Sequence, residues 1–389
     1  MTNRPDVTSL PPALRRLVAG GPPDASAVQA FLDRHTFPLV EEGRCTFVYR
    51  GDVEGVALRH WIQGLPATQP FHRIDGTDLW FLVLELPEGS RVEYKLEVTE
   101  NGGSSLMEDP LNPLRARDPF GANSVCHAHG YQVPDWTRPD PEAPRGMLTE
   151  RSLRSRFLAG ARRLSVYTPA ERPNSGPYPL LVVHDGPDFL RYSALRTVLD
   201  NLIHRRIIPP LLAAMIEPGE RLEEYAASVA HARFLMEELV PSLEKRHPLI
   251  RASRGRCLMG ASLGAVASLH AATQAPGYFA RLLLQSGPFV FPGAGRDTHS
   301  SALDPVARFM THFRSAPVRA ADQVFLTCGA YESLVRQNRA LVPVLQRAGM
   351  DVRYVEALDG HNWENWRDRL GEGLPWLFAT SPPAQRTHA

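Results

Sequence analysis

A serine between two glycines is the first feature of this sequence that could do chemistry. Ser262 lies midway between Gly260 and Gly264, after a short apolar strand predicted at residues 257–259 and before an alanine-rich helical run. In such a strand, turn and helix setting, the G-x-S-x-G pattern exposes its serine as a nucleophile. The glycines permit the tight turn, because a side chain at either position would crowd the neighbouring backbone. We therefore predict that Ser262 attacks a carbonyl carbon.

A nucleophilic serine needs a base and an acid, and in this arrangement the chain order is serine, acid, histidine. His361 follows the predicted strand 352–358 through a short turn, and we expect it to be the base. Glu332 is the first carboxylate after the predicted strand 323–328, and we expect it to orient that base. Alternatives stay open: Asp359 is nearer to His361 in sequence although it shares its turn, and Glu332 could simply cap the next helix.

The negative charge that develops on the carbonyl oxygen needs two N–H donors that are already in place. One is expected to be the amide of Leu263, directly after the nucleophile. The other normally comes from the loop after an early strand, here residues 184–189. Pro187 has no N–H to offer, so Gly186 or Asp188 must donate unless a side chain substitutes.

These residues depend on a C-terminal region in which strands and helices alternate, a pattern typical of a mostly parallel sheet covered by helices. The run 178–184 is apolar throughout, as in strands that are buried on both faces. The carboxyl ends of parallel strands meet at one edge of the sheet, where a site is expected. We predict strands at 163–167, 178–184, 208–216, 257–259, 281–286, 323–328 and 352–358, and helices at 229–246, 333–348 and 363–378.

The first part of the chain predicts a small all-β domain. Short segments rich in Val, Tyr, Phe and Trp are separated by turn residues, which is typical of an antiparallel, immunoglobulin-like sandwich. Trp61 and Trp80 are expected in its core rather than on a ligand surface. His127 and His129 have no partner at metal-ligand spacing, so no metal site is expected there. The predicted strands are 45–49, 55–61, 79–84 and 92–98.

These patterns divide the chain into an α/β domain, a β-sandwich and connecting segments. A short helix near the N-terminus is expected to begin at a cap formed by Asp24 or Ser26. A segment with repeated prolines has no apolar period and is interpreted as a linker. The expected division is an N-terminal extension with the short helix (1–37), the sandwich (38–132), the linker (133–149), the α/β domain (150–380) and a tail (381–389).

Composition argues against several classes of function. The chain has 389 residues, and its 43 Lys and Arg nearly cancel its 42 Asp and Glu, so no strong field attracts nucleic acid or an anionic membrane. Neither a signal peptide nor an apolar run long enough to span a bilayer is apparent, and a cytoplasmic protein is expected. The four scattered cysteines predict neither a disulfide framework nor a zinc site, and no cofactor is expected. A small molecule or neutral polymer is the expected partner; the oligomeric state is left open.

Together, five motifs resemble those of the enterochelin esterase and esterase D branch of the α/β-hydrolases. They are Asp185-Gly186; residues 221–225 with 237–241; residues 260–264; Gln285-Ser286-Gly287; and residues 360–363 with Trp366-Arg367. The sandwich, with its string at 109–113, resembles the domain that precedes the hydrolase in ferric enterochelin esterases. The resemblance covers almost the whole chain. It implies an α/β-hydrolase fold and a serine esterase with Ser262 as nucleophile, Glu332 as acid and His361 as base.

Two positions depart from the pattern of the resembled family. Ala265 stands where the family often has a second glycine, and Pro187 stands where related mycolyltransferases take their second oxyanion donor. Loss of one such donor costs about 2.7 to 4 kcal/mol in known cases, so the second change bears directly on catalysis. A non-catalytic binding or assembly protein that retains the fold is therefore one alternative function.

The preferred hypothesis is a serine ester hydrolase that works through an acyl-enzyme. The resemblance implies a ferric siderophore lactone of the enterochelin type as substrate, with feruloyl or acetyl esters of sugars as the alternative. Asp185, Arg221 and Trp363 are candidate substrate contacts. For Arg221, a structural ion pair with Glu224 is the preferred interpretation.

Overall fold

The computed structural model describes residues 10–171, 176–290 and 301–378, which form two compact units. The N-terminal unit comprises the chain up to Gln132 together with two later loops, Ala330–Glu332 and Ala357–Gly360. The C-terminal unit comprises the remainder. The expected tail at 381–389 lies outside the described residues.

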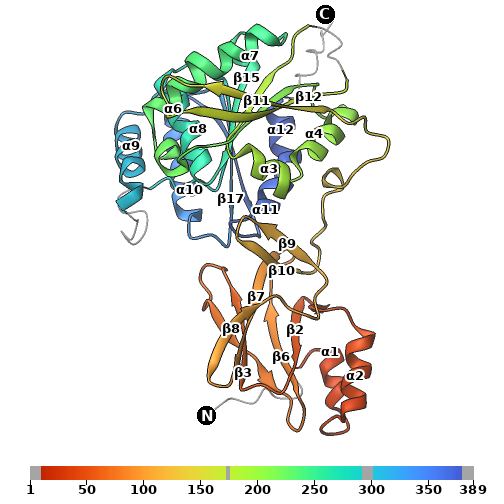
Figure 1. Cartoon of the computed structure of the whole chain (residues 1–389). Helices are drawn as coiled ribbons and strands as arrows, with labels where there is room; N and C mark the ends of the chain where they lie inside the picture. Colours follow the sequence, from red (N-terminus) through yellow and green to blue (C-terminus); the bar gives the residue numbers. More distant parts are fainter. Residues whose placement is uncertain (1–9, 172–175, 291–300, 379–389) are drawn as a thin grey trace, which may run out of the picture. The chain divides into compact units, whose positions relative to one another are not determined.

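An eight-stranded sheet organises the C-terminal unit (Figure 1). Its first two pairings, at one edge, are antiparallel, and the four pairings of its interior are parallel. In spatial order the strands are β11 (Met147–Arg154), β12 (Ala161–Thr168), β14 (Leu212–Ile216), β13 (Leu180–Val183), β15 (Arg256–Ala261), β16 (Arg281–Gln285), β17 (Gln323–Gly329) and β18 (Asp351–Ala357). The predicted strands are all present. The antiparallel edge strand β11 was not predicted, because its largely exposed sequence has no apolar run.

Helices cover both faces of this sheet, and alternate residues of each central strand face opposite cores. Leu180 and Val182 join one apolar cluster, whereas Leu181 and Val183 join the other. The first face carries α6 (Val229–Arg233), the π-helical segment η3 (Phe234–Leu239), α7 (Val240–Arg246), α8 (Leu263–Gln274), α9 (Asp304–Ser315) and α10 (Val335–Arg347). The second carries α3 (Gly186–Tyr192), α4 (Leu195–His204), α11 (Trp363–Asp368) and α12 (Leu370–Phe378). The helix predicted at 229–246 is thus one helical run with a π-helical middle.

The N-terminal unit contains two antiparallel sheets that share a core. One sheet has the order β1 (Leu39–Glu41), β2 (Arg44–Arg50), β6 (Leu79–Glu85), β5 (His72–Arg73). The other has the order β4 (Thr68–Pro70), β3 (Gly55–His60), β7 (Arg91–Glu100), β10 (Gly121–His127), β9 (Arg115–Asp118), and β8 (Gly103–Met107) pairs with β7. Phe47 from the first sheet and Tyr94 from the second meet edge to face, with ring centroids 4.9 Å apart.

The two tryptophans of this unit differ from each other. Trp80 is buried, as predicted, but Trp61 is 61% exposed, so its expected place in the core is wrong. Trp61 lies just beyond the end of β3, where the period of two that puts alternate side chains inward no longer applies. Ahead of the sheets lie helices α1 (Pro12–Val18) and α2 (Ala25–Arg34), and Asp24 caps the latter by accepting from the N–H of Ala27 at 2.8 Å.

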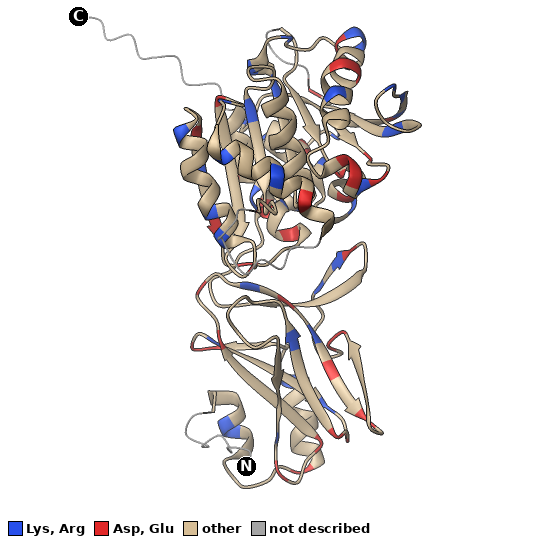
Figure 2. Cartoon of the chain, turned by 90° about the vertical axis from the view of Figure 1, so that its left-hand side faces the viewer, with Lys and Arg blue, Asp and Glu red and all other residues tan. Residues whose placement is uncertain are grey.

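The segment interpreted as a linker contains the short 3-10 turn η2 (Asp135–Thr137), and its last residues already belong to β11. The four cysteines are buried free thiols. Acidic and basic residues are interspersed over both units in the view of Figure 2. Within the described ranges, every helix is too short or too polar to cross a membrane.

Candidate active site

The elbow, residues 260–264, is a strained turn between β15 and α8. Ser262 has φ 53° and ψ −126°, a conformation that side-chain-bearing residues rarely adopt. A Cβ atom on Gly260 would lie 2.3 Å from the carbonyl carbon of Gly264, so only glycine fits there. The N–H of Ser262 donates to the carbonyl of Gln285 on the neighbouring strand at 2.8 Å, which holds the strained residue in place. The side chain of the serine is half-buried at the carboxyl edge of the sheet.

The loop after β13 lies directly against the elbow. A Cβ atom on Gly264 would approach the Cβ of His184 to 3.0 Å and Oδ2 of Asp185 to 3.4 Å. Gly186, the first residue of α3, has no room for a side chain either, since a Cβ would lie 2.4 Å from the backbone of Met215. These close approaches bring the loop and Ser262 to one edge of the sheet.

This contact narrows the choice of oxyanion donors. The N–H of Asp188 already donates to the carbonyl of Asp185 at 3.1 Å, and Pro187 has no N–H. The amides of Gly186 and Leu263 are the first of their helices and make no hydrogen bond to any described residue. Of the three positions considered for the second donor, Gly186 therefore keeps an available N–H.

Asp185 and Arg221 form a two-bonded ion pair beside this loop. The Nε and Nη2 atoms of Arg221, in α5 (Arg221–Tyr225), donate to the two carboxylate oxygens of Asp185 at 2.8 Å each. The expected pairing of Arg221 with Glu224 is wrong, because Glu224 instead accepts from the buried guanidinium of Arg162. Residues 221 and 224 are one helical turn apart, so sequence spacing permitted the pair. Arg162 could not be foreseen from such a local pattern.

A buried pair of histidines lies under the elbow. Nδ1 of His184 contacts the carbonyl of Met259 at 3.0 Å, and its Nε2 contacts Nε2 of His231 at 3.0 Å. Because a carbonyl only accepts, Nδ1 of His184 carries the proton, and His231 donates to the Nε2 lone pair. Burial lowers the pKa of His184 to about 4, and burial followed by the proximity of His184 lowers that of His231. Both rings are therefore neutral supports for the turn above them.

His361 is tied to the elbow through Trp366 and the end of β16. The imidazole of His361 packs edge to face on Trp366, with centroids 5.0 Å apart. The indole N–H of Trp366 donates to Oγ of Ser286 at 3.0 Å, and its carbonyl accepts from the Gln285 side chain at 2.8 Å. Since the backbone of Gln285 also holds Ser262, one strand end supports both the predicted nucleophile and the predicted base.

The two candidate acids lie in the loops that group with the N-terminal unit. Glu332 is 3% exposed. The carboxylate of Asp359 contacts Nη1 of Arg91 at 3.2 and 3.3 Å and accepts from the N–H of Gly360 at 2.7 Å. Its oxygens are thus already engaged by a buried cation and a backbone amide. Ser262 and His361 belong to the C-terminal unit.

Trp363 is surrounded by aromatic rings of its own unit. It meets Phe189 at 5.3 Å and Trp366 at 4.8 Å between centroids, both edge to face, and its carbonyl accepts from Oγ of Ser193. These contacts join α11 to α3, which begins at Gly186. Trp363 therefore packs α11 against α3 beside the candidate site, independently of any contact with substrate.

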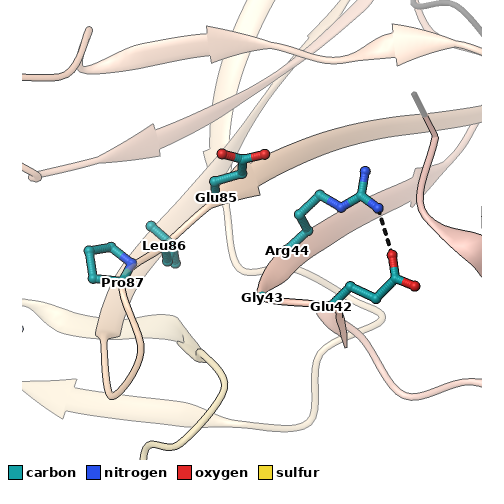
Figure 3. A pocket seen from close by; sticks show the side chains of 6 residues that line it. All are labelled: Glu42, Gly43, Arg44, Glu85, Leu86 and Pro87. Atoms are coloured by element: carbon teal, nitrogen blue, oxygen red, sulfur yellow. Dashed lines mark hydrogen bonds and ion pairs between the residues drawn. The ribbon is translucent and has the colours of Figure 1, made fainter.

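A surface pocket on the N-terminal unit contains none of the predicted site residues (Figure 3). It is lined by Glu42, Gly43, Arg44, Glu85, Leu86 and Pro87. The guanidinium of Arg44 pairs with Glu42 at 2.9 Å across its mouth. Over the described ranges, no group of three His, Cys, Asp or Glu side chains is arranged to hold a metal ion.

Comparison with known families decides the class of this protein. A family described as putative esterase matches residues 155–377, more than half of the chain. The chain belongs to that esterase family. It is accordingly an ester hydrolase, and the elbow lies within the matched residues.

Relatives and solved structures extend the likeness to the N-terminal unit. The esterase is 24% identical to the iron(III) enterobactin esterase of Escherichia coli O6:H1 (strain CFT073), over 78% of this chain and 80% of that protein. It is 25% identical to the iron(III) enterobactin esterase of Dickeya dadantii, over 89% and 91% of the two chains. The ferric enterobactin esterase structure from Salmonella typhimurium superposes with a TM-score of 0.72 at 22% identity, covering 87% of this chain and 94% of that one. The esterase therefore has an α/β-hydrolase-type fold.

Several structurally important residues of the esterase were missed by sequence reasoning. Gln285 and Ser286 were noted only as part of a motif, without a role. Arg91 was not singled out, because an arginine at the start of an alternating strand carries no signal of burial. His184 and His231 likewise gave no hint of their contact, since 47 residues separate them.

Proposed function

We propose that the esterase hydrolyses its substrate through a Ser262, His361 and Glu332 triad. His361 takes the proton of the Ser262 hydroxyl as Oγ attacks the ester carbonyl carbon, and then passes that proton to the departing alcohol oxygen. The acyl group stays on Ser262 until water, deprotonated by His361, attacks it and releases the acid. Glu332 orients the imidazole and stabilises its charged form. The observation that carries this proposal is the strained conformation of Ser262, which follows a position, Gly260, where only glycine fits.

The oxyanion is proposed to accept from the amides of Leu263 and Gly186. Both N–H groups begin a helix, where the aligned peptide dipoles favour negative charge. Gly186 is fixed by its close approach to Met215 and by the ion pair of the preceding Asp185 with Arg221. The proposed hole is thus rigid before substrate arrives, which is the condition for strong stabilisation. Asp185 and Arg221 act here by holding the loop, and substrate contacts by Arg221 and Trp363 stay proposals.

For substrate we place a ferric siderophore lactone of the enterochelin type first. The support is the extent of the likeness: both enterobactin esterase relatives align over at least 78% of this chain. By the same likeness, the N-terminal unit is proposed to be an immunoglobulin-like sandwich at 38–132, joined to the hydrolase domain at 150–380 by the linker, and the protein to act in the cytoplasm. Feruloyl or acetyl esters of sugars are the second candidate. A ferulic acid esterase structure covers 60% of this chain with a TM-score of 0.51, and an acetyl esterase of Caldicellulosiruptor saccharolyticus is 32% identical over 59 residues.

The class of reaction is tested with p-nitrophenyl acetate and butyrate. Ser262→Ala is expected to lower kcat on the order of 10⁶-fold, as loss of the nucleophile does in serine proteases. Ser242→Ala, which removes a surface hydroxyl on α7 that accepts from Arg246, is the matched control and should leave kcat unchanged. Equal rates for the wild type and Ser262→Ala, with no labelling of Ser262 by a fluorophosphonate, would support the non-catalytic alternative.

Substrate choice needs a separate measurement. Iron-loaded enterobactin, methyl ferulate and an acetylated xylan are each incubated with the wild type and with Ser262→Ala, and the products are identified by mass. Linear trimers of the lactone formed only by the wild type would support the siderophore. Intact lactone together with released ferulate or acetate would move the assignment to sugar esters.

A further inference from the structure

The start of strand β7 holds the two loops that carry the proposed acid and lead to the proposed base. We infer that Arg91 is a positioning residue for catalysis, acting through Asp359 on the loop that continues into His361. This inference rests on the proposed function, because it concerns the base of the proposed triad.

Arg91 is the largest fully buried side chain of the protein's described ranges, with 0% exposure. Its Nη2 atom donates to Glu93 at 2.9 Å, and its Nη1 atom contacts both oxygens of Asp359, 268 positions along the chain. Its backbone N–H donates to the carbonyl of Leu358 at 2.9 Å. Main chain and side chain of one residue therefore hold two consecutive residues of the loop 357–360.

Ser90, the residue just before β7, holds the other loop. Oγ of Ser90 and the hydroxyl of Tyr331 lie 2.5 Å apart, and Tyr331 directly precedes Glu332. The N–H of Gln63 donates to the carbonyl of Tyr331 at 2.8 Å. The loops are also joined to each other, since the N–H of Tyr331 donates to the carbonyl of Asp359 at 3.1 Å. The two loops are thus joined to each other and held by adjacent residues, one by Ser90 just before β7 and the other by Arg91 at its start.

The chemistry of Arg91 suits positioning rather than general stabilisation. A buried guanidinium is expensive to desolvate, and replacing a buried ion pair by apolar side chains is often neutral or stabilising. The pair instead fixes the place of Asp359, because the planar guanidinium bridges two carboxylates, with Nη2 on Glu93 and Nη1 shared between both oxygens of Asp359. Asp359 is two residues from His361, so holding Leu358 and Asp359 limits where the chain can place the imidazole.

The test uses the full chain and p-nitrophenyl acetate, with rates expressed per serine labelled by a fluorophosphonate at completion. Arg91→Met is expected to lower kcat by about 100-fold, the effect of displacing a reacting group by about an ångström, while KM stays within about 2-fold. Arg91→Lys keeps the charge but not the planar fork and is expected to recover part of the loss. Asp359→Asn should lower kcat as well, and the double variant Arg91→Met with Asp359→Asn should lose less than the product of the two single losses.

Arg50→Met is the matched control, because Arg50 pairs with Asp78 at 2.9 Å in the same unit and contacts neither loop. Its kcat should equal that of the wild type. Wild-type kcat per labelled serine in Arg91→Met would overturn the inference. Should Arg91→Met not fold, Arg91→Lys and Asp359→Asn decide: a lowered kcat at unchanged KM and melting temperature supports it, and wild-type kcat in both overturns it. An inactive wild type would instead overturn the proposed function.

Discussion

The elbow and the pair of loops at 330–332 and 357–360 supply the proposed triad in different ways. At the elbow, the conformation of Ser262 depends largely on its own neighbours, because a Cβ atom on Gly260 would lie 2.3 Å from the carbonyl carbon of Gly264 within the same five residues. The loops depend instead on Ser90 and Arg91, which lie about 240 and 268 positions away. The proposed nucleophile is thus placed largely by local backbone geometry, whereas the loops of the proposed acid and base are held by distant contacts.

This difference explains where the sequence could be interpreted reliably. The elbow has a spacing that a single sequence displays, and the carboxyl ends of the predicted strands gave His361 and Glu332 as residues of the same sheet edge. The contacts that hold those loops leave no local trace. The absence of a local signal also explains why the wrong partner was predicted for Arg221. A spacing of three residues in a helix suggested Glu224, whereas the partner in the structure, Asp185, lies 36 positions earlier.

The largest expected effect tests which loop supplies the acid. Glu332→Gln is expected to lower kcat by about 10⁴-fold, as removal of the charge from a triad acid does, because the amide favours the wrong imidazole tautomer. The measurement is kcat for p-nitrophenyl acetate, normalised to labelled Ser262. It tests whether the buried carboxylate of Glu332, in the loop 330–332, acts on His361, which follows the loop 357–360.

Asp359→Asn is the matched control for Glu332→Gln, because it makes the same carboxylate-to-amide change in the neighbouring loop. Its loss should stay within about 100-fold if Asp359 acts only by position. The reverse ranking, with Asp359→Asn the more damaging change, would identify Asp359 as the acid. The engagement of Asp359 by Arg91 and Gly360 favours the first outcome.

The fold of the C-terminal unit was largely predictable because its strands are continuous apolar runs. Leu180 to Val183 is buried on both faces and could hardly be anything else. Strand β11 was missed for the opposite reason, since only one neighbour pairs with it and its side chains are mostly exposed. Trp61 shows the limit of residue type as a guide, because a tryptophan on a turn does not follow the inward parity of its strand.

A smaller effect concerns the stability of the elbow and follows from its buried histidines. Burial lowers the pKa of His184 to about 4 and that of His270, on the elbow helix α8, to about 4. Above pH 6.5, the usual pKa of histidine, these rings are neutral in both the folded and the unfolded chain. Below pH 6.5, the histidines of the unfolded chain bind protons that those of the folded chain do not. Stability is therefore lost as the pH falls from about 6.5 to 4, by about 3 kcal/mol for each such group.

Urea unfolding of the full chain between pH 7.5 and 4, a range set by these shifts, measures this loss. His270→Gln should reduce the loss of unfolding free energy over this pH range by the contribution of one histidine. His204→Gln is the control, because it makes the same substitution at a partly exposed histidine on α4, outside the elbow. A free energy of unfolding that stays level across this range would contradict the neutral histidine support beneath Ser262.

The smallest expected effect lies beside the elbow, at Pro187. Pro187→Ala restores an N–H at the position from which related mycolyltransferases are expected to take a donor. If Gly186 already supplies the second donor, the new amide is superfluous and kcat should change by less than about 3-fold, well below the 10²-fold effect of a missing donor. A modest fall in melting temperature is expected, because proline suits the first turn of a helix.

A different result at Pro187 would change the view of the elbow. A rise in kcat of about 100-fold in Pro187→Ala would mean that the wild type lacks a donor and is a slow enzyme. Ala194→Gly is a suitable control for altered backbone freedom, since Ala194 has a positive φ of 47° at the start of α4, in the same unit, and should affect kcat little. With kcat unchanged in both variants, Gly186 would stand as the second donor, in a turn that Arg221 and Met215 hold beside the elbow. The elbow would then be the part of the site that depends least on distant contacts.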